Sequence, residues 1–395
     1  MSTEIKTVVD SLSSLARPDD VNQAYVTVDR YSRESRTSDL VELATAIEDA
    51  CDVDSPAKMA YEAVADHVEE VLALTRGGDH LDALLALLAK DRVRSVTRPR
   101  PREVRVRAFA SKLGHGQTKD ALVAAVGRFG AAGEHVEILA CWMHELVLRG
   151  TALDRDPAIV KFHAQLGERK HPLGAMPLRL LEAESEAPTY MPMYGANAIS
   201  KAVARLESGP TTRRTIPPAG DHIPPSVTRA PDAAVEARLL EPAGPWTASP
   251  AGKAEAKVYR LDPPLEFASP GRWLLRALSL DCVEGSPTLW AERAGADAVW
   301  GALFAAAANG GAWSAGLGGA YGRSAAWASL GAFVDAPADA TPPQIDERAP
   351  LAQFLMFGAS GGAAGWWNDI AWDLGVLAVR PGGGSVAVLA ATDGE

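Results

Sequence analysis

Residues 370–392 read IAWDLGVLAVRPGGGSVAVLAAT, two apolar runs on either side of a proline–glycine cluster. The runs 370–380 and 385–392 are rich in Val, Leu and Ala, and β-branched residues favour strands. The cluster Pro381–Gly384 contains the residue types that form tight turns. We therefore predict a β-hairpin at this end of the chain.

The residues before this hairpin mix element types. Residues 257–261 resemble a strand, 288–308 and 321–334 have the length and composition of buried helices, and 339–350 form a polar loop. We predict a Trp- and Gly-rich α+β domain over residues 251–395.

Residues 1–208 show helical periodicity. Apolar residues recur at i, i+3, i+4 and i+7 in two places: Leu40, Leu43, Ala44 and Ile47, then Leu81, Leu84, Leu85 and Leu88. Further helices are expected over 101–113, 118–129, 133–149 and 172–184. Breaks between these segments predict an all-α scaffold of stacked helical hairpins, either an irregular solenoid or a bundle.

Residues 209–250 are crowded with prolines: Pro210, Pro217, Pro218, Pro224, Pro225, Pro231, Pro242, Pro245 and Pro250. Proline at this density disfavours a long helix or a central strand. We predict a Pro-rich linker over 209–250, joining a scaffold of residues 1–208 to the domain of residues 251–395. The overall fold class is α+β.

The charge and cysteine content restrict the classes of partner and compartment. The 395 residues carry a net charge of −11, which opposes nucleic acid or an anionic membrane as the main partner. The apolar run 298–308 is shorter than the roughly 20 residues that span a bilayer. Three scattered cysteines without a CxxC pair and an N-terminus unlike a signal peptide predict a cytoplasmic protein.

Histidine and tryptophan are distributed unevenly. Nine of the ten tryptophans follow residue 240, while all eight histidines precede residue 223. The C-terminal domain must therefore work without imidazole unless the first half supplies it, which disfavours Ser-His, Cys-His and His-rich zinc sites there. We predict no metal and no cofactor.

The segments NGGAWSAGLGGAYGRSAAWASLGAF (309–333) and WWNDIAWDLGVLAVRPGGGSVAVLAATDGE (366–395) resemble a bacterial family known only as a domain of unknown function. The resemblance is strongest over residues 309–395. The resemblance implies membership of this family, but it implies no activity and no catalytic residues.

A glycine-rich stretch precedes the helix expected at 321–334. Glycines before a helix N-terminus let a phosphate approach the backbone N–H groups, which makes Gly316, Gly318 and Gly319 candidate ligand-binding residues. However, Tyr321 stands where a GxGxxG motif needs its third glycine, and no GK[ST] follows. The alternative is a tight connection between two buried helices.

Four polar residues of the same region lie among aromatic residues: Tyr321, Arg323, Asp369 and Asp373. In one interpretation they line a catalytic pocket in which a carboxylate pair transfers protons and Trp313, Trp327 and Trp367 hold a small-molecule ligand. In the other, Arg323 forms a buried ion pair with Asp369 or Asp373, and the tryptophans are core.

Two further clusters lie in the helical part. Arg92–Arg107 contains seven arginines, which could neutralise acidic groups of the same chain, bind a protein partner or, least favoured, grip nucleic acid. Cys141 is followed by His144 and Glu145 without the second histidine of HExxH, so packing is favoured over a cysteine hydrolase.

These patterns favour a cytosolic two-domain protein that binds a partner protein, because helical hairpins offer surface and little chemistry. The alternative is a hydrolase or transferase that uses Tyr321, Arg323, Asp369 and Asp373 on an unknown substrate.

Binding to DNA or RNA should be weak and salt-sensitive despite the arginine cluster. A net charge of −11 repels phosphates at long range, so only the sequence-independent contribution remains. Anisotropy titrations with duplex and single-stranded oligonucleotides test this. A submicromolar dissociation constant at physiological salt would contradict it.

Overall fold

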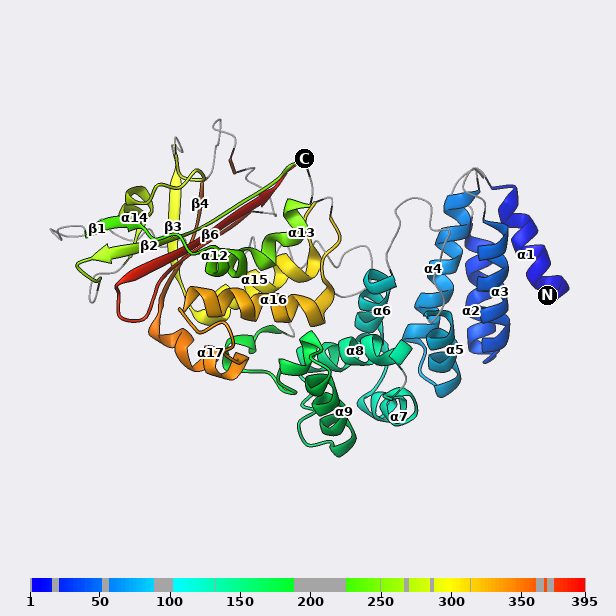
Figure 1. Ribbon diagram of the computed structural model, residues 1–395. Coiled ribbons are helices and arrows are strands. Elements are labelled where there is room, and N and C mark those ends of the chain that lie inside the picture. The colour runs from blue at the N-terminus through cyan, green and yellow to red at the C-terminus, as the bar shows by residue number, and fades with distance from the viewer. Residues whose placement is uncertain are drawn as a thin grey trace. The chain divides into compact units, whose positions relative to one another are not determined.

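The computed structural model covers residues 1–395 (Figure 1). It describes residues 2–15, 21–51, 57–88, 102–131, 133–187, 225–248, 250–265, 270–284, 288–312, 314–359, 366–367 and 373–394.

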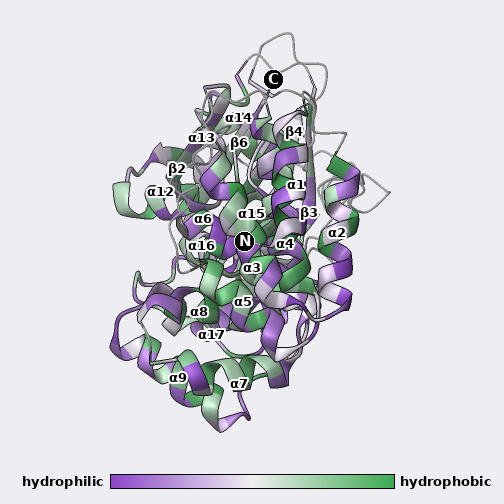
Figure 2. Cartoon of the chain, turned by 90° about the vertical axis from the view of Figure 1, so that its right-hand side faces the viewer, coloured by the Kyte–Doolittle hydropathy of each residue, from purple (hydrophilic) through white to green (hydrophobic). Residues whose placement is uncertain are grey.

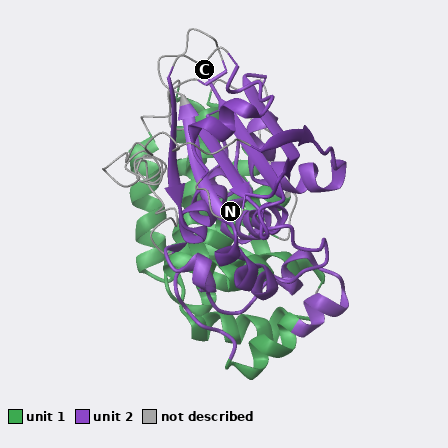
Figure 3. Ribbon diagram, turned by 90° about the vertical axis from the view of Figure 1, so that its left-hand side faces the viewer, with its two compact units in different colours: residues 1–146, 155–163 green, residues 147–154, 164–395 purple. Residues whose placement is uncertain are grey.

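Contacts divide the chain into two compact units (Figure 3). Unit 1 comprises residues 1–146 and 155–163, and unit 2 comprises residues 147–154 and 164–395. Unit 2 therefore takes in residues that the sequence analysis assigned to the scaffold and to the linker.

Unit 1 is helical. Its elements are α1 (Thr3–Ser13), α2 (Asn22–Arg33), α3 (Thr37–Ala50), α4 (Lys58–Leu74), α5 (Gly78–Leu88), α6 (Arg102–Gly116), α7 (Lys119–Phe129), η2 (Gly133–His135), most of α8 (Val136–Leu148) and the greater part of α9 (Pro157–Glu168).

The first six helices form two layers. Helices two apart along the chain pack together, α1 with α3 and α5 in one layer and α2 with α4 and α6 in the other. Three contacts run in the same direction along α2 and α4: Tyr25 to Ala63, Asp29 to His67, and Ser32 to Thr75, the residue that follows α4. The two helices are therefore parallel, as stacked helical hairpins require, and the predicted helical-hairpin scaffold is confirmed.

Amphipathic sequences explain this packing. In α3 the predicted apolar residues Leu40, Leu43, Ala44 and Ile47 are all buried. Figure 2 shows hydrophilic and hydrophobic residues side by side on α2, α3 and α4. Each helix can thus bury one face against its neighbours while its opposite face meets solvent.

Unit 2 combines one sheet with helices and 3-10 turns. In chain order the elements are η3 (Pro172–Ala175), η4 (Glu182–Glu184), β1 (Ser226–Arg229), α12 (Ala233–Leu240), η5 (Glu241–Ala243), α13 (Gly244–Thr247), β2 (Gly252–Asp262), α14 (Arg272–Ala277), β3 (Leu289–Ala294), α15 (Ala296–Asn309), α16 (Gly318–Phe333), α17 (Pro342–Arg348), η6 (Ala349–Leu351), β4 (Gln353–Ala359), β5 (Asp373–Val379) and β6 (Ser385–Asp393).

The sheet has the order β1-β2-β6-β5-β4-β3, and each described strand pair is antiparallel. The predicted C-terminal hairpin is confirmed as β5 and β6, with Val379 opposite Val386 and Asp373 opposite Thr392. It lies at the centre of the sheet, where almost every residue of both strands is buried. On one face Leu377 and Val388 pack with residues of α14, and α12, α15 and α16 contact the sheet as well.

Four local predictions differ from the structure. Residues 288–308 form strand β3 and then α15, because Gly295 interrupts the run and precedes α15. Residues 172–184 contain only the short turns η3 and η4, since Pro172 and Pro177 prevent a continuous helix. The polar loop 339–350 includes α17, which Thr341 and Gln344 cap. Helix α9 was not predicted.

Part of the predicted linker 209–250 lies outside the described residues. Its described end forms β1, α12 and α13, so the prolines there stand beside regular elements. Pro245 occupies the first turn of α13, where its missing N–H costs nothing. No helix among the described residues is long and apolar enough to cross a membrane.

Helices α15 and α16 pack closely where Gly322 meets Ala308, because both residues are small. A Cβ on Gly322 would lie 2.8 Å from the Cβ and 2.9 Å from the backbone N and Cα of Ala308. A Cβ on Gly316 would collide with the Ala308 carbonyl, and Gly318 has φ +74°. Helix packing therefore accounts for the glycines at 316 and 322.

Replacing Gly322 by alanine should destabilise unit 2 by about 1 to 3 kcal/mol, because the added methyl group meets backbone that cannot move aside. Gly127 is the matched control: it is also helical but has no atom within 4 Å of its Cβ position. Gly127→Ala should stabilise the protein by about 0.5 to 1 kcal/mol. Urea unfolding followed by circular dichroism measures both, and equal effects would contradict the packing argument.

Candidate functional site

Arg323 forms the best-connected polar site of unit 2. It lies on α16 with no exposed surface, and its Nε and Nη2 donate to the two carboxylate oxygens of Glu184 at 2.6 and 2.7 Å. Its Nη1 donates to the Pro177 carbonyl at 2.8 Å, and Nη2 also donates to the Arg179 carbonyl at 3.0 Å. The guanidinium thus attaches the segment 177–184 to α16.

The Glu184 carboxylate is equally well satisfied. Besides Arg323, it accepts from the Trp327 indole Nε1 at 2.6 Å and from the Leu181 backbone N at 2.9 Å. Glu184 is also fully buried. Each carboxylate oxygen therefore accepts two hydrogen bonds, which is what a buried carboxylate needs to be tolerated and leaves none of its lone pairs for a substrate.

This ion pair corrects one prediction. The expectation that Arg323 is buried against a carboxylate is confirmed, but the ion pair is formed with Glu184 and not with Asp373. Asp373 is half-buried at the start of β5, where its carboxylate accepts from Thr392 Oγ1 at 2.6 Å. Asp369 lies outside the described residues. Glu184 was missed because it is 139 residues from Arg323 in the chain and belongs to no motif.

The other residues proposed for this pocket occupy different surroundings. Tyr321 is half-buried on α16, and Trp327 belongs to the Glu184 site. Trp367 is buried on the α14 side of the sheet and donates to the Cys282 carbonyl at 2.8 Å. Gly319 is buried within α16, and Trp313 lies outside the described residues. Arg323, Trp327 and Trp367 therefore have structural partners, while a ligand role for the glycines stays a prediction.

An open hollow of about 370 Å³ lies elsewhere in unit 2, lined by residues of α12 and of the segment after α16, including Asp232, Arg238 and Asp335. None of the predicted site residues lines it. Beside it, Arg380 pairs with Asp335 at 3.1 Å, and its burial lowers its pKa. The hollow carries both signs of charge and presents no predominantly anionic or cationic wall.

The described part of the arginine cluster is neutralised within unit 1. Arg105 is buried and donates to Glu69 at 2.5 Å, and Arg107 lies 4.0 Å from Glu137. Residues 92–100 lie outside the described residues. For Arg105 and Arg107 the structure supports intramolecular neutralisation.

The cysteine cluster is buried in the helical unit. Burial raises the pKa of the Cys141 thiol, and the carboxylates of Glu137 and Glu145 raise it further. A thiol with a raised pKa stays protonated at neutral pH and is a poor nucleophile. This disfavours a cysteine hydrolase at Cys141. No group of three or more His, Cys, Asp or Glu side chains suited to a metal occurs among the residues the structure describes.

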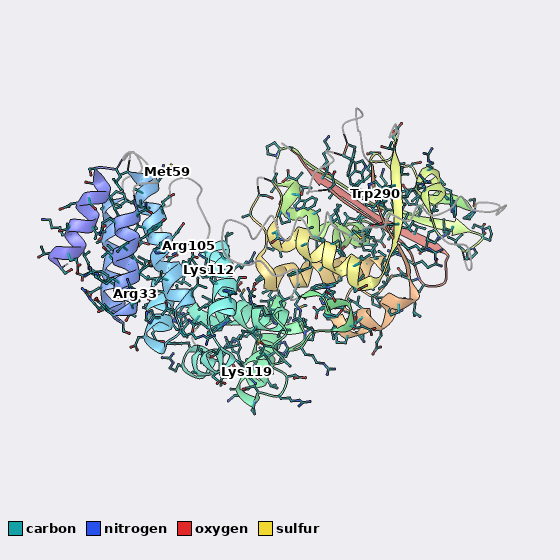
Figure 4. The ribbon with its side chains drawn as sticks, turned by 180° about the vertical axis from the view of Figure 1, so that it is seen from behind. Arg33, Met59, Arg105, Lys112, Lys119 and Trp290 are labelled. Carbon is teal, nitrogen blue, oxygen red and sulfur yellow. The ribbon has the colours of Figure 1, made fainter. Side chains whose placement is uncertain are left out.

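Unit 1 carries a surface feature that the sequence patterns did not identify. Val26 on α2 and Met59 on α4 are 54% and 53% exposed, and they belong to adjacent parallel helices. Figure 4 shows Met59 near the beginning of α4 and Arg33 near the end of α2. We call the outward side of these two helices the α2/α4 surface.

Acidic side chains accompany these apolar ones. Glu62 and Asp66 follow Met59 on α4 at helical spacing. On α2, the Tyr25 ring lies 4.2 Å from the His67 ring, and Asp29 bonds to His67 at 2.9 Å. Burial, together with the carboxylates of Asp66 and Glu70, raises the pKa of Tyr25. The α2/α4 surface therefore combines exposed apolar groups with negative potential.

A two-layer helical unit followed by an antiparallel sheet with helices defines an α+β protein whose most substantial buried polar site is structural. A model of the family described as "Family of unknown function (DUF6183)" matches residues 22–395, so the chain belongs to this family. Comparisons with curated proteins and with solved structures gave no match.

A double-mutant cycle tests the Arg323–Glu184 pair. Arg323→Met alone should cost about 3 to 5 kcal/mol of unfolding free energy, because it leaves a buried carboxylate uncompensated. Its coupling to Glu184→Gln should exceed about 1 kcal/mol, whereas its coupling to Asp373→Asn should stay below about 0.5 kcal/mol. Urea denaturation of the six proteins supplies both values. A larger coupling to Asp373 would contradict the assignment.

Proposed function

We propose that this protein binds a partner protein through the α2/α4 surface, and that the partner presents a basic segment carrying apolar side chains. The observation that carries the proposal is the exposure of Val26 on α2 and of Met59 on the adjacent α4, where Glu62 and Asp66 follow Met59 at helical spacing. Exposed apolar groups bordered by charged ones are typical of protein interaction sites.

The charge of the helices supports a basic partner. Over the described residues 2–88, fourteen Asp and Glu side chains stand against six Lys and Arg side chains. Several of these basic groups already pair within the unit, including Arg30 with Glu4 and Arg36 with Asp39. The remaining field is negative, so it attracts a cationic segment and repels an anionic one.

The architecture supports the same conclusion. Two parallel helices side by side offer a surface on which an amphipathic helix or extended segment can pack. The buried pair of Arg105 with Glu69 and the partly exposed pair of Lys112 with Glu70 attach α6 to α4 in the same layer. A surface held in this way is preformed, which lowers the entropic cost of binding.

The alternative of an enzyme is disfavoured because Arg323, the central residue of its pocket, is already hydrogen-bonded within the protein. A pocket built on Tyr321, Arg323, Asp369 and Asp373 requires a guanidinium available to substrate, whereas Arg323 is consumed by Glu184 and two carbonyls. A small-molecule ligand could still bind to unit 2 at the open hollow, because none of the residues of the predicted pocket lines it. Three free, buried cysteines are compatible with the cytoplasmic location that we also propose.

A synthetic amphipathic helix made of Lys and Leu serves as the probe. Fluorescence anisotropy at low ionic strength should show saturable binding to the protein, and a matched Glu–Leu helix should bind much more weakly. Glu62→Lys combined with Asp66→Lys should weaken binding of the Lys–Leu helix about tenfold or more, because attraction becomes repulsion.

The control is Asp10→Lys combined with Asp79→Lys, which makes the same charge change on α1 and α5, in the other layer. This variant should lose little affinity beyond the general charge effect. An equal loss of affinity in both variants would show that only net charge matters, and would refute the proposal that the α2/α4 surface is the binding site. Val26→Ser with Met59→Ser tests the apolar contribution, and no loss of affinity there would also count against the proposal.

A further inference from the structure

The carboxylate of Asp393 is the least satisfied buried group of unit 2. Asp393 is the last residue of β6 and pairs with Gly252 of β2. Its side chain has no exposed surface, and neither oxygen has a hydrogen-bond partner among the described residues. An ionised carboxylate in this condition is strongly destabilising unless a positive group compensates it.

The carboxylate lies against the turn that follows α15. A Cβ on Gly311 would collide with Asp393 Oδ2, so a glycine at this position lets the carboxylate reach the turn. The backbone of the turn is held by Gly311 N, which donates to Ser314 Oγ at 3.1 Å, and by Gly310, whose φ of +78° only glycine adopts readily. Asp393 is thus aimed at a fixed loop.

The loop itself adds negative potential. A helix C-terminus carries a partial negative charge from its last carbonyls, and α15 ends at Asn309, two residues before Gly311. Its Ala306 carbonyl accepts from Gly310 N and from Trp246 Nε1, both at 3.2 Å, and its Ala307 carbonyl accepts from Leu317 N. A carboxylate and a helix C-terminus facing one loop both favour a cation between them.

We propose that Asp393 and the turn residues Asn309, Gly310 and Gly311 bind a monovalent metal ion, Na⁺ or K⁺. One buried carboxylate balances one positive charge, whereas Ca²⁺ sites draw on several carboxylates, and no three-acid group lies here among the described residues. Backbone and carboxylate oxygens are the ligands that such hard cations accept. The ion compensates Asp393 and stabilises the end of the central strand β6.

The test is the dependence of thermal stability on the cation. Unfolding is followed by tryptophan fluorescence, since nine of the ten tryptophans belong to unit 2 and Trp246 contacts the end of α15. Replacing tetramethylammonium chloride by NaCl or KCl at constant ionic strength should raise the melting temperature by about 5 °C when the ion saturates its site.

Asp393→Asn should abolish this cation dependence, whereas Asp373→Asn should retain it, because Asp373 lies one pair away in the same sheet and bonds to Thr392 instead. Line broadening of ²³Na in solutions of the wild-type protein, reversed by KCl, gives a readout that does not depend on any variant folding.

Three results would overturn the proposal. One is a wild-type melting temperature that does not distinguish Na⁺ or K⁺ from tetramethylammonium. Another is an Asp393→Asn variant with undiminished cation dependence. The last is a ²³Na signal that the protein leaves unchanged.

Discussion

The bidentate pair between Arg323 and Glu184 is the interaction on which unit 2 depends. Burying two charges costs more than their attraction returns unless the remaining hydrogen-bonding positions are filled. Here Trp327 Nε1, the Leu181 N–H and two backbone carbonyls fill them. Because these groups come from segments far apart in the chain, residues 177–184 are bound into the sheet-containing unit although they precede the proline-rich region.

Small residues have the complementary role in the apolar part of unit 2. Gly322 and Ala308 let α15 and α16 approach at backbone distance, and alanines fill half of the buried positions of α15. Packing this close leaves no space for a ligand where Gly322 meets Ala308. The glycine-rich stretch that resembles a phosphate loop in sequence therefore has a sufficient explanation in the contact of these helices.

The two units consequently differ in what they can offer a partner. In unit 2 most described polar groups are paired within the fold; among the buried atoms without a hydrogen-bond partner are Trp273 Nε1, Trp300 Nε1, Arg380 Nε and both carboxylate oxygens of Asp393. In unit 1 the helices bury their apolar faces and still expose Val26 and Met59 beside carboxylates. The partner binding that we propose would take its specificity from the charge pattern of the α2/α4 surface.

The sequence by itself determined those helices and turns whose characteristic residues are close together in the chain. The periodic leucines of α3 and α5 and the turn between β5 and β6 were predictable because their residues are neighbours in the chain. Whether a single glycine or proline ends an element could not be decided from the sequence, so the break at Gly295 between β3 and α15 was missed. The partner of Arg323, the exposure of Val26 and Met59, and the burial of Asp393 were decided by tertiary structure alone, because each depends on which distant segment packs against the residue.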